Sequence, residues 1–119
     1  MAISGWIAVD LDGTLAHYDG WVSPLHIGEP IPNMVKRVKK WLSEGVEVRI
    51  FTARAWKADE KEMSFIQDWV EKHIGVRLAV TCTKDYGMIE LWDDRAVSVK
   101  SNTGLTTKEW EEANGRKET

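Results

Sequence analysis

Residues 6–15 read Trp-Ile-Ala-Val-Asp-Leu-Asp-Gly-Thr-Leu. Four apolar residues lead directly into Asp10 and Asp12, which predicts a buried strand that ends by bringing two carboxylates to one place. Like charges held this close repel each other, and removing them from water costs free energy unless a partner compensates. A cation or a chemical reaction is therefore the expected reason for the pair.

The size and composition of the chain indicate one globular domain over residues 1–119, with a frayed tail at 115–119. The chain has 119 residues, of which 43% are hydrophobic, and a net charge of −3, which disfavours a dedicated nucleic-acid binder. Cys82 is the single cysteine, so no intrachain disulfide can form, and we expect it in the core. Without a signal-peptide pattern or a membrane-length apolar run, the expected location is the cytoplasm, with no membrane partner.

Strand and helix patterns alternate along the chain. Glycines and prolines make residues 16–30 an irregular, flap-sized loop. Periodicity and turn residues predict strands at 6–10, 46–51, 76–82 and 89–92, and a further short strand at 96–100. They also predict three helices: the first begins at Ile31, the second spans 57–73, and the third begins at a capping box formed by Thr106 and Glu109. This order predicts an α/β, Rossmann-like three-layer sandwich around a central parallel sheet.

Polar residues follow each predicted strand. Asp10 ends the first strand and Thr52 the second, Lys84 follows the third, and Asp93 and Asp94 end the fourth. Ligands of such sheets bind outside the carboxyl ends of the strands. We therefore expect these side chains to meet at one edge of the sheet.

Up to four carboxylates at one edge favour a hard cation with oxygen ligands. Mg²⁺ suits few carboxylates and leaves positions for water and phosphate, and no His or Cys cluster suggests zinc. Thr52 and Lys84 then suit a bound phosphate, one through a hydrogen bond and the other through charge. One carboxylate beside that phosphate can act as a nucleophile, and a second can act as general acid and base.

The same residues resemble the motifs of the haloacid dehalogenase-like hydrolase superfamily, without a cap domain. Asp-Leu-Asp-Gly-Thr at 10–14 is similar to motif I, Phe-Thr-Ala-Arg at 51–54 to motif II, Lys84 to motif III and Asp93-Asp94 to motif IV. The resemblance implies a phosphatase in which Asp10 is the nucleophile and a metal ligand. It implies that Asp12 is the general acid/base and binds the metal through its backbone carbonyl. Thr52 and Lys84 would hold the phosphoryl group, and Asp93 and Asp94 would complete the metal shell.

The predicted loops are too short for a cap domain, so the site is expected to be open. An open site admits a bulky phosphorylated substrate, or else another subunit of a homo-oligomer covers it. The Thr-Ala-Arg turn and residues 69–78 and 93–95 also resemble the 3′-phosphatase domain of phage polynucleotide kinase, which implies a nucleotide or a nucleic-acid end as substrate. The loop aromatics Tyr18, Trp21, Trp56 and Tyr86 either stack on a base or cover the core.

Several alternatives stay open at this point. A receiver-type phosphoacceptor domain shares the acidic pair but needs an aspartate after its third strand, where this chain has Cys82 and Thr83. A non-catalytic phosphate-binding module is the other rival. Among single residues, Thr52 binds phosphate or caps a helix, Arg54 contacts substrate or an acidic neighbour, and Asp94 binds metal or pairs with Arg95.

Overall fold

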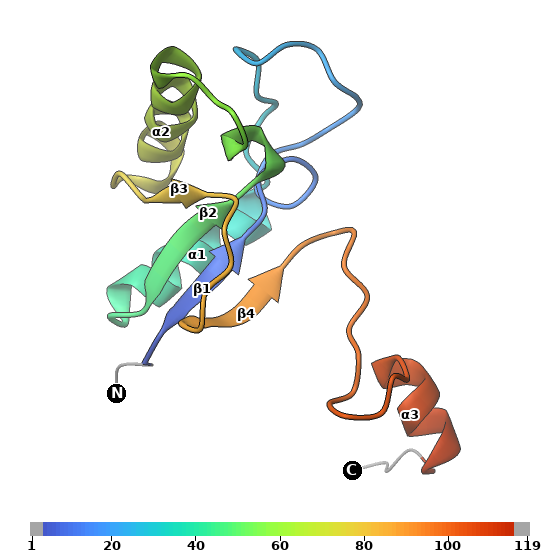
Figure 1. Cartoon of the computed structure of the whole chain (residues 1–119). Helices are drawn as coiled ribbons and strands as arrows, with labels where there is room; N and C mark the ends of the chain where they lie inside the picture. The colour runs from blue at the N-terminus through green and yellow to red at the C-terminus, as the bar shows by residue number, and fades with distance from the viewer. Residues whose placement is uncertain (1–3, 116–119) are drawn as a thin grey trace.

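The computed structural model describes residues 4–115 and contains a four-stranded, all-parallel sheet (Figure 1). The strands lie in the order β3-β2-β1-β4, with bounds β1 Trp6–Val9, β2 Glu47–Phe51, β3 Val80–Thr81 and β4 Met88–Trp92. Val9 pairs with Ile50 of β2 on one side and with Trp92 of β4 on the other. The predicted α/β, Rossmann-like fold with a parallel sheet is confirmed, and no cap domain interrupts it.

Helices α1 (Pro32–Ser43) and α2 (Glu60–Ile74) pack on each other and on the sheet. The core between these helices and the sheet is apolar and includes Ile7, Val9, Val38, Ile66 and Val70. Ile7 and Val9 alternate along β1, so both point toward the helices. This core fixes the position and direction of β1 in the sheet. It therefore also fixes the position of Asp10, which directly follows the strand.

The connection at 82–87, rather than a helix, covers the opposite face of the sheet at β1. The indole N–H of Trp6 donates a hydrogen bond to Asp85 over 2.9 Å, and the guanidinium of Arg49 lies 4.4 Å from the Trp6 ring centre. Trp6 is fully buried as a result. Where a three-layer sandwich would carry a helix between β3 and β4, this chain therefore uses a short loop packed on one tryptophan.

The second predicted helix starts three residues later than expected. Asp59 accepts a hydrogen bond from the backbone N–H of Glu62, whose side chain accepts one from the backbone N–H of Asp59. This capping box fixes the start of α2 at Glu60. Lys57 lies outside the helix, with a φ of +60°. Gly75 ends the helix in the left-handed conformation, which glycine adopts readily.

The third strand is shorter than the predicted span of 76–82. Arg77 forms ion pairs of 2.8 Å with Asp68 and 2.9 Å with Glu71, both on α2. These contacts hold the segment after Gly75 against the helix, and only Val80–Thr81 pairs with β2 as a strand. The prediction of a full-length strand from apolar residues alone was wrong for this reason.

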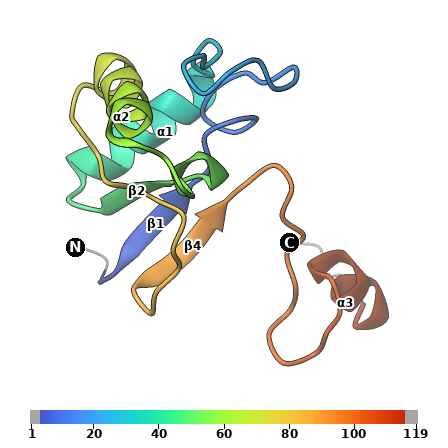
Figure 2. The ribbon, with the colours of Figure 1, turned by 45° about the horizontal axis from the view of Figure 1, so that its top comes forward.

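The predicted strand at 96–100 does not join the sheet. Within the described residues, Val99 forms only an isolated bridge with Thr106, and residues 95–115, here called the C-terminal arm, lead away from β4 to α3 (Thr107–Ala113) (Figures 1 and 2). The arm makes the molecule elongated: its radius of gyration is 16.1 Å, against about 13.5 Å for a compact chain of this length. The capping box predicted for α3 is confirmed.

Residues 116–119 of the predicted tail lie outside the described residues. Over the described part of the chain, the helices are too short or too polar to cross a bilayer.

Replacing Val38 by alanine tests the core, with Val97 as a matched control. Val38 is fully buried, whereas Val97 in the C-terminal arm is 70% exposed. We expect Val38→Ala to lower the free energy of unfolding by about 2 kcal/mol, because two buried methyl groups are lost and a cavity remains. Val97→Ala should change it by less than about 0.5 kcal/mol. Urea denaturation of both variants measures this, and equal losses would contradict the packing described here.

Candidate active site

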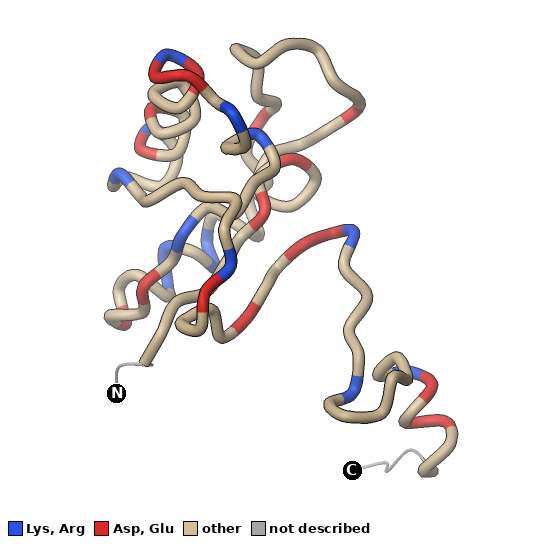
Figure 3. Tube along the Cα trace, in the orientation of Figure 1, with Lys and Arg blue, Asp and Glu red and all other residues tan. Residues whose placement is uncertain are grey.

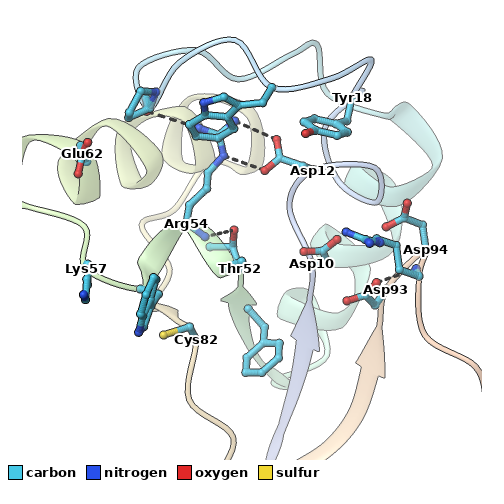
Figure 4. A pocket seen from close by; sticks show the side chains of 16 residues that line it. Asp10, Asp12, Tyr18, Thr52, Arg54, Lys57, Glu62, Cys82, Asp93 and Asp94 are labelled. Atoms are coloured by element: carbon cyan, nitrogen blue, oxygen red, sulfur yellow. Dashed lines mark hydrogen bonds and ion pairs between the residues drawn. The ribbon is translucent and has the colours of Figure 1, made fainter.

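A pocket of about 1040 Å³ lies at the carboxyl edge of the sheet (Figure 4). Six of the seven predicted site residues line it, namely Asp10, Asp12, Thr52, Arg54, Asp93 and Asp94. They come from the ends of β1, β2 and β4. The prediction that polar residues after separate strands meet at one edge is therefore confirmed for Asp10, Thr52, Asp93 and Asp94, but not for Lys84.

Asp10, Asp93 and Asp94 form a compact carboxylate cluster. One oxygen from each lies within 4.8 Å of the others. The backbone N–H of Asp10 donates to the carbonyl of Trp92 over 2.9 Å, so the ends of β1 and β4 are held level. In Figure 3 an acidic stretch follows β4 directly and is itself followed by a basic position. Three convergent carboxylate oxygens suit a small hard cation such as Mg²⁺.

Gly13 and Thr14 hold Asp94 in this cluster. Gly13 has a φ of +90°, and a side chain there would collide with the carboxylate of Asp94. The Thr14 hydroxyl accepts from the backbone N–H of Asp94 over 3.1 Å and donates to its carboxylate over 3.3 Å. Asp94 forms these contacts rather than the ion pair with Arg95 that the sequence left open. The role of Thr14 was missed, although its place in the Asp-Leu-Asp-Gly-Thr stretch was the available signal.

The cluster raises the pKa of Asp10 from its ordinary value of 3.8 to about 7. Burial is the main cause, because it removes water from the ionised form, and the negative charges of Asp93, Asp94 and Asp12 add to it. An attacking carboxylate must be ionised. A cation bound among the three carboxylates favours that ionised form, so the electrostatics of the site and the chemistry of a metal agree.

Asp12 is turned away from the cluster and is paired with Arg54. Both carboxylate oxygens accept from the guanidinium, at 2.7 and 3.0 Å, and the Arg54 side chain is only 8% exposed. Arg54 also donates to the carbonyl oxygen of His26 over 2.8 Å. Of the two readings left open for Arg54, the structure shows contact with an acidic neighbour. The guanidinium fork therefore sets where the Asp12 carboxyl points (Figure 4).

Thr52 has the two features that the sequence offered as alternatives. It is buried, lines the pocket, and its hydroxyl oxygen accepts from the backbone N–H of Arg54 over 3.1 Å. That contact caps the short helix η1 (Ala53–Ala55). A hydroxyl that accepts one hydrogen bond still has its own proton to donate. Capping and binding of a phosphoryl oxygen are therefore compatible at Thr52.

Lys84 is the predicted site residue that does not line the pocket. It is exposed in the 82–87 connection, which turns back along the sheet toward the start of β4. The basic residues that do line the pocket are Arg54, Lys57 and Arg95. Sequence order placed Lys84 after a strand, but the connection is too short to carry a helix that would bring it to the pocket.

Cys82 and three of the four loop aromatics also lie at the pocket. Cys82 is exposed and lines it, so the expectation of a core cysteine was wrong, because the strand that would have buried it ends at Thr81. Tyr18, Trp21 and Trp56 line the pocket, whereas Tyr86 does not and is fully exposed.

Comparison with known proteins adds support for the fold. No protein-family model matches the chain, and no curated protein matches it. Among solved structures, the chain is similar to a conserved protein from Bacteroides thetaiotaomicron, with a TM-score of 0.57 and 18% sequence identity, over 98% of this chain and 94% of the other. At this identity the similarity speaks for the architecture alone.

The raised pKa of Asp10 predicts a pH-dependent stability in metal-free protein. Between pH 3.8 and about 7 the native state binds more protons at Asp10 than the unfolded chain does, so wild-type stability falls as pH rises. Asp10→Asn removes this cost. We expect the variant to gain roughly 2–4 kcal/mol over wild type on going from about pH 4 to about pH 8, measured by urea denaturation with a chelator present.

Two comparisons make this test specific. Added Mg²⁺ should restore much of the wild-type stability at the higher pH. It should stabilise Asp10→Asn less, because the variant lacks one of the three carboxylates. Glu112→Gln, at an exposed carboxylate on α3, is the control for removal of a carboxylate. A gain for Asp10→Asn that is the same at both pH values would contradict the assignment.

Proposed function

We propose that this protein is a Mg²⁺-dependent phosphatase that hydrolyses a phosphate monoester through an aspartyl-phosphate on Asp10. The observation that carries the proposal is the pairing of two different environments two residues apart. Asp10 lies in the carboxylate cluster with Asp93 and Asp94, and Asp12 is held beside it by Arg54. The resemblance to haloacid dehalogenase-like hydrolases supports the same assignment of roles.

In the first step an Asp10 carboxylate oxygen forms a bond to phosphorus, and the bond from phosphorus to the ester oxygen breaks. For this step Asp12 must carry a proton, which it gives to the departing oxygen, so that the product leaves as an alcohol. Both Asp12 oxygens accept hydrogen bonds from Arg54 in the structure, so the mechanism requires one of these contacts to open when Asp12 takes up its proton.

In the second step Asp12, now ionised, takes a proton from a water molecule. The water oxygen attacks the phosphorus of the aspartyl-phosphate, the bond from phosphorus to Asp10 breaks, and inorganic phosphate leaves. Both aspartates end in their starting states, so the cycle needs no further reactant.

Asp10, Asp93 and Asp94 are the side chains that would hold the metal, with the backbone carbonyl of Asp12 as a further ligand. When bound, Mg²⁺ neutralises carboxylate and phosphate charge. Thr52 is suited to donate a hydrogen bond to a phosphoryl oxygen. Two residues are candidates for the positive charge expected beside the phosphate. The family resemblance implies Lys84, whereas Arg95 lines the pocket together with Asp93 and Asp94.

The open pocket favours a bulky substrate, such as a nucleotide or a polynucleotide 3′-phosphate. That a second subunit covers the site stays a prediction. A receiver domain is disfavoured, because Cys82 and Thr83 follow β3 where the phosphoacceptor aspartate would stand. A phosphate-binding module without catalysis is the remaining alternative, and turnover separates it from an enzyme.

Hydrolysis of p-nitrophenyl phosphate with and without Mg²⁺ tests the proposal. We expect turnover that requires Mg²⁺ and that Asp10→Asn reduces by at least about 10³-fold, because the amide cannot form the intermediate. Glu112→Gln, at an exposed position on α3, should retain wild-type rates. If wild type and Asp10→Asn are equally inactive on a panel of phosphate esters, the enzyme assignment fails; stable phosphorylation by acetyl phosphate without turnover would favour the receiver.

The two candidate cations can be separated by a second pair of variants. Lys84 is outside the pocket and Arg95 lines it. We therefore expect Arg95→Ala to reduce kcat/KM by roughly 10- to 100-fold, the usual cost of a charge-assisted hydrogen bond, and Lys84→Ala to leave it within about 3-fold. The opposite ranking would show that the 82–87 connection moves to the pocket when substrate binds.

A further inference from the structure

Both exposed tryptophans of the chain lie at the pocket. Of the seven tryptophans, Trp21 and Trp56 have exposed fractions of 58% and 68%, while the other five are buried or partly buried. Tyr18, on the same 16–30 loop as Trp21, also lines the pocket and is 45% exposed. Exposed aromatic rings gathered at a pocket indicate a binding surface rather than a covered core.

A cation holds each of the two indoles. The guanidinium carbon of Arg54 lies 4.8 Å from the ring centre of Trp21, and the ammonium of Lys57 lies 4.6 Å from that of Trp56. Arg54 is itself hydrogen-bonded to Asp12 and to the carbonyl of His26, so the side chain on which Trp21 packs is tied to two other segments. Lys57 has a left-handed backbone conformation, which a non-glycine residue seldom adopts and which is often found at ligand sites.

From this arrangement we infer that Tyr18, Trp21 and Trp56 form a stacking subsite for the base of a nucleoside phosphate. This inference rests on the proposed function, because the phosphate of the same ligand would lie at Asp10. Rings held in place by neighbouring cations lose little conformational entropy when a flat ligand stacks on them. Stacking on a base needs no particular hydrogen-bonding pattern, so it suits any of the common bases.

The dimensions of the pocket fit the same class of ligand. Its volume of about 1040 Å³ lies just above the roughly 300–1,000 Å³ typical of small-molecule sites, far larger than one phosphoryl group requires. A small phosphate ester without a ring, such as glycerol 2-phosphate, would leave the exposed aromatic rings without a stacking partner. Acidic side chains outnumber Arg54, Lys57 and Arg95 in the lining, so a ligand that bears phosphate would bind together with the proposed cation.

The base could belong to a free nucleotide or to the last nucleotide of a strand. The chemistry recognised is the same, and the ligands in the experiment separate the two sources. Tyr86 provides a matched control, since it is an exposed aromatic residue outside the pocket.

Binding to the Asp10→Asn protein in the presence of Mg²⁺, measured by calorimetry, tests the subsite without turnover. The ligands are a nucleoside 3′-monophosphate, glycerol 2-phosphate and a short oligonucleotide with a 3′-phosphate. Adding Trp56→Ala or Trp21→Ala should weaken binding of the nucleotide roughly 5- to 150-fold, which corresponds to the usual stacking contribution of 1–3 kcal/mol. The same substitutions should leave the affinity for glycerol 2-phosphate within about 2-fold, and Tyr86→Ala should change the affinity for neither ligand.

The outcomes are decisive in both directions. Trp56→Phe, which keeps an aromatic face, should recover most of the nucleotide affinity. Equal weakening of nucleotide and glycerol 2-phosphate, or no binding of any nucleoside phosphate, overturns the subsite. A wild-type protein that binds the nucleotide through these rings but hydrolyses no ester would instead contradict the proposed function and leave the subsite standing. Binding of the mononucleotide as tight as that of the oligonucleotide assigns the free nucleotide, and tighter binding of the oligonucleotide assigns the strand end.

Discussion

Electrostatic repulsion among Asp10, Asp93 and Asp94 is the constraint on which the site depends. Three carboxylates are brought within 4.8 Å because β4 pairs directly with β1 and both strands end at the same level. The fold keeps them there with a glycine at position 13 that leaves room for Asp94 and with the hydroxyl of Thr14. The apolar core under β1 supplies the free energy that this arrangement costs, since the cluster itself opposes folding when no cation is bound.

The same short stretch places its second aspartate in the opposite environment. Asp10 faces negative charge, whereas Asp12, two residues later, faces the guanidinium of Arg54. Without a metal, burial and negative charge favour a neutral Asp10, whereas the proposed nucleophile must be ionised, so the role proposed for Asp10 depends on a bound cation. The separation of the two aspartates along the chain is what produces the contrast, because the backbone leaves the strand at Asp10 and turns before Asp12.

How far the sequence predicted this structure depends on the range of the interactions involved. The ends of β1, β2 and β4 and the α3 capping box are local, and they were predicted from neighbouring residues. The short β3 was not, because it depends on ion pairs from Arg77 back to α2. The partner of Arg54 and the distance of Lys84 from the pocket likewise depend on where distant segments lie. Composition gives no sign of such contacts, so the presence of the acidic residues and of Arg54 at the site was predictable, whereas the pairing of Arg54 and the position of Lys84 were not.

Arg54 joins separate parts of the site. Its guanidinium binds the Asp12 carboxylate, the His26 carbonyl of the 16–30 loop and the face of Trp21 on that same loop. Trp69 of α2 also holds the loop, by donating to the carbonyl of Gly28 over 3.2 Å. The 16–30 loop is therefore fixed at both the pocket and the helix, although it contains no regular secondary structure. Under the proposed function, a ligand stacked on Trp21 would press on the residue that orients Asp12, so base recognition and proton transfer would share the Arg54 side chain.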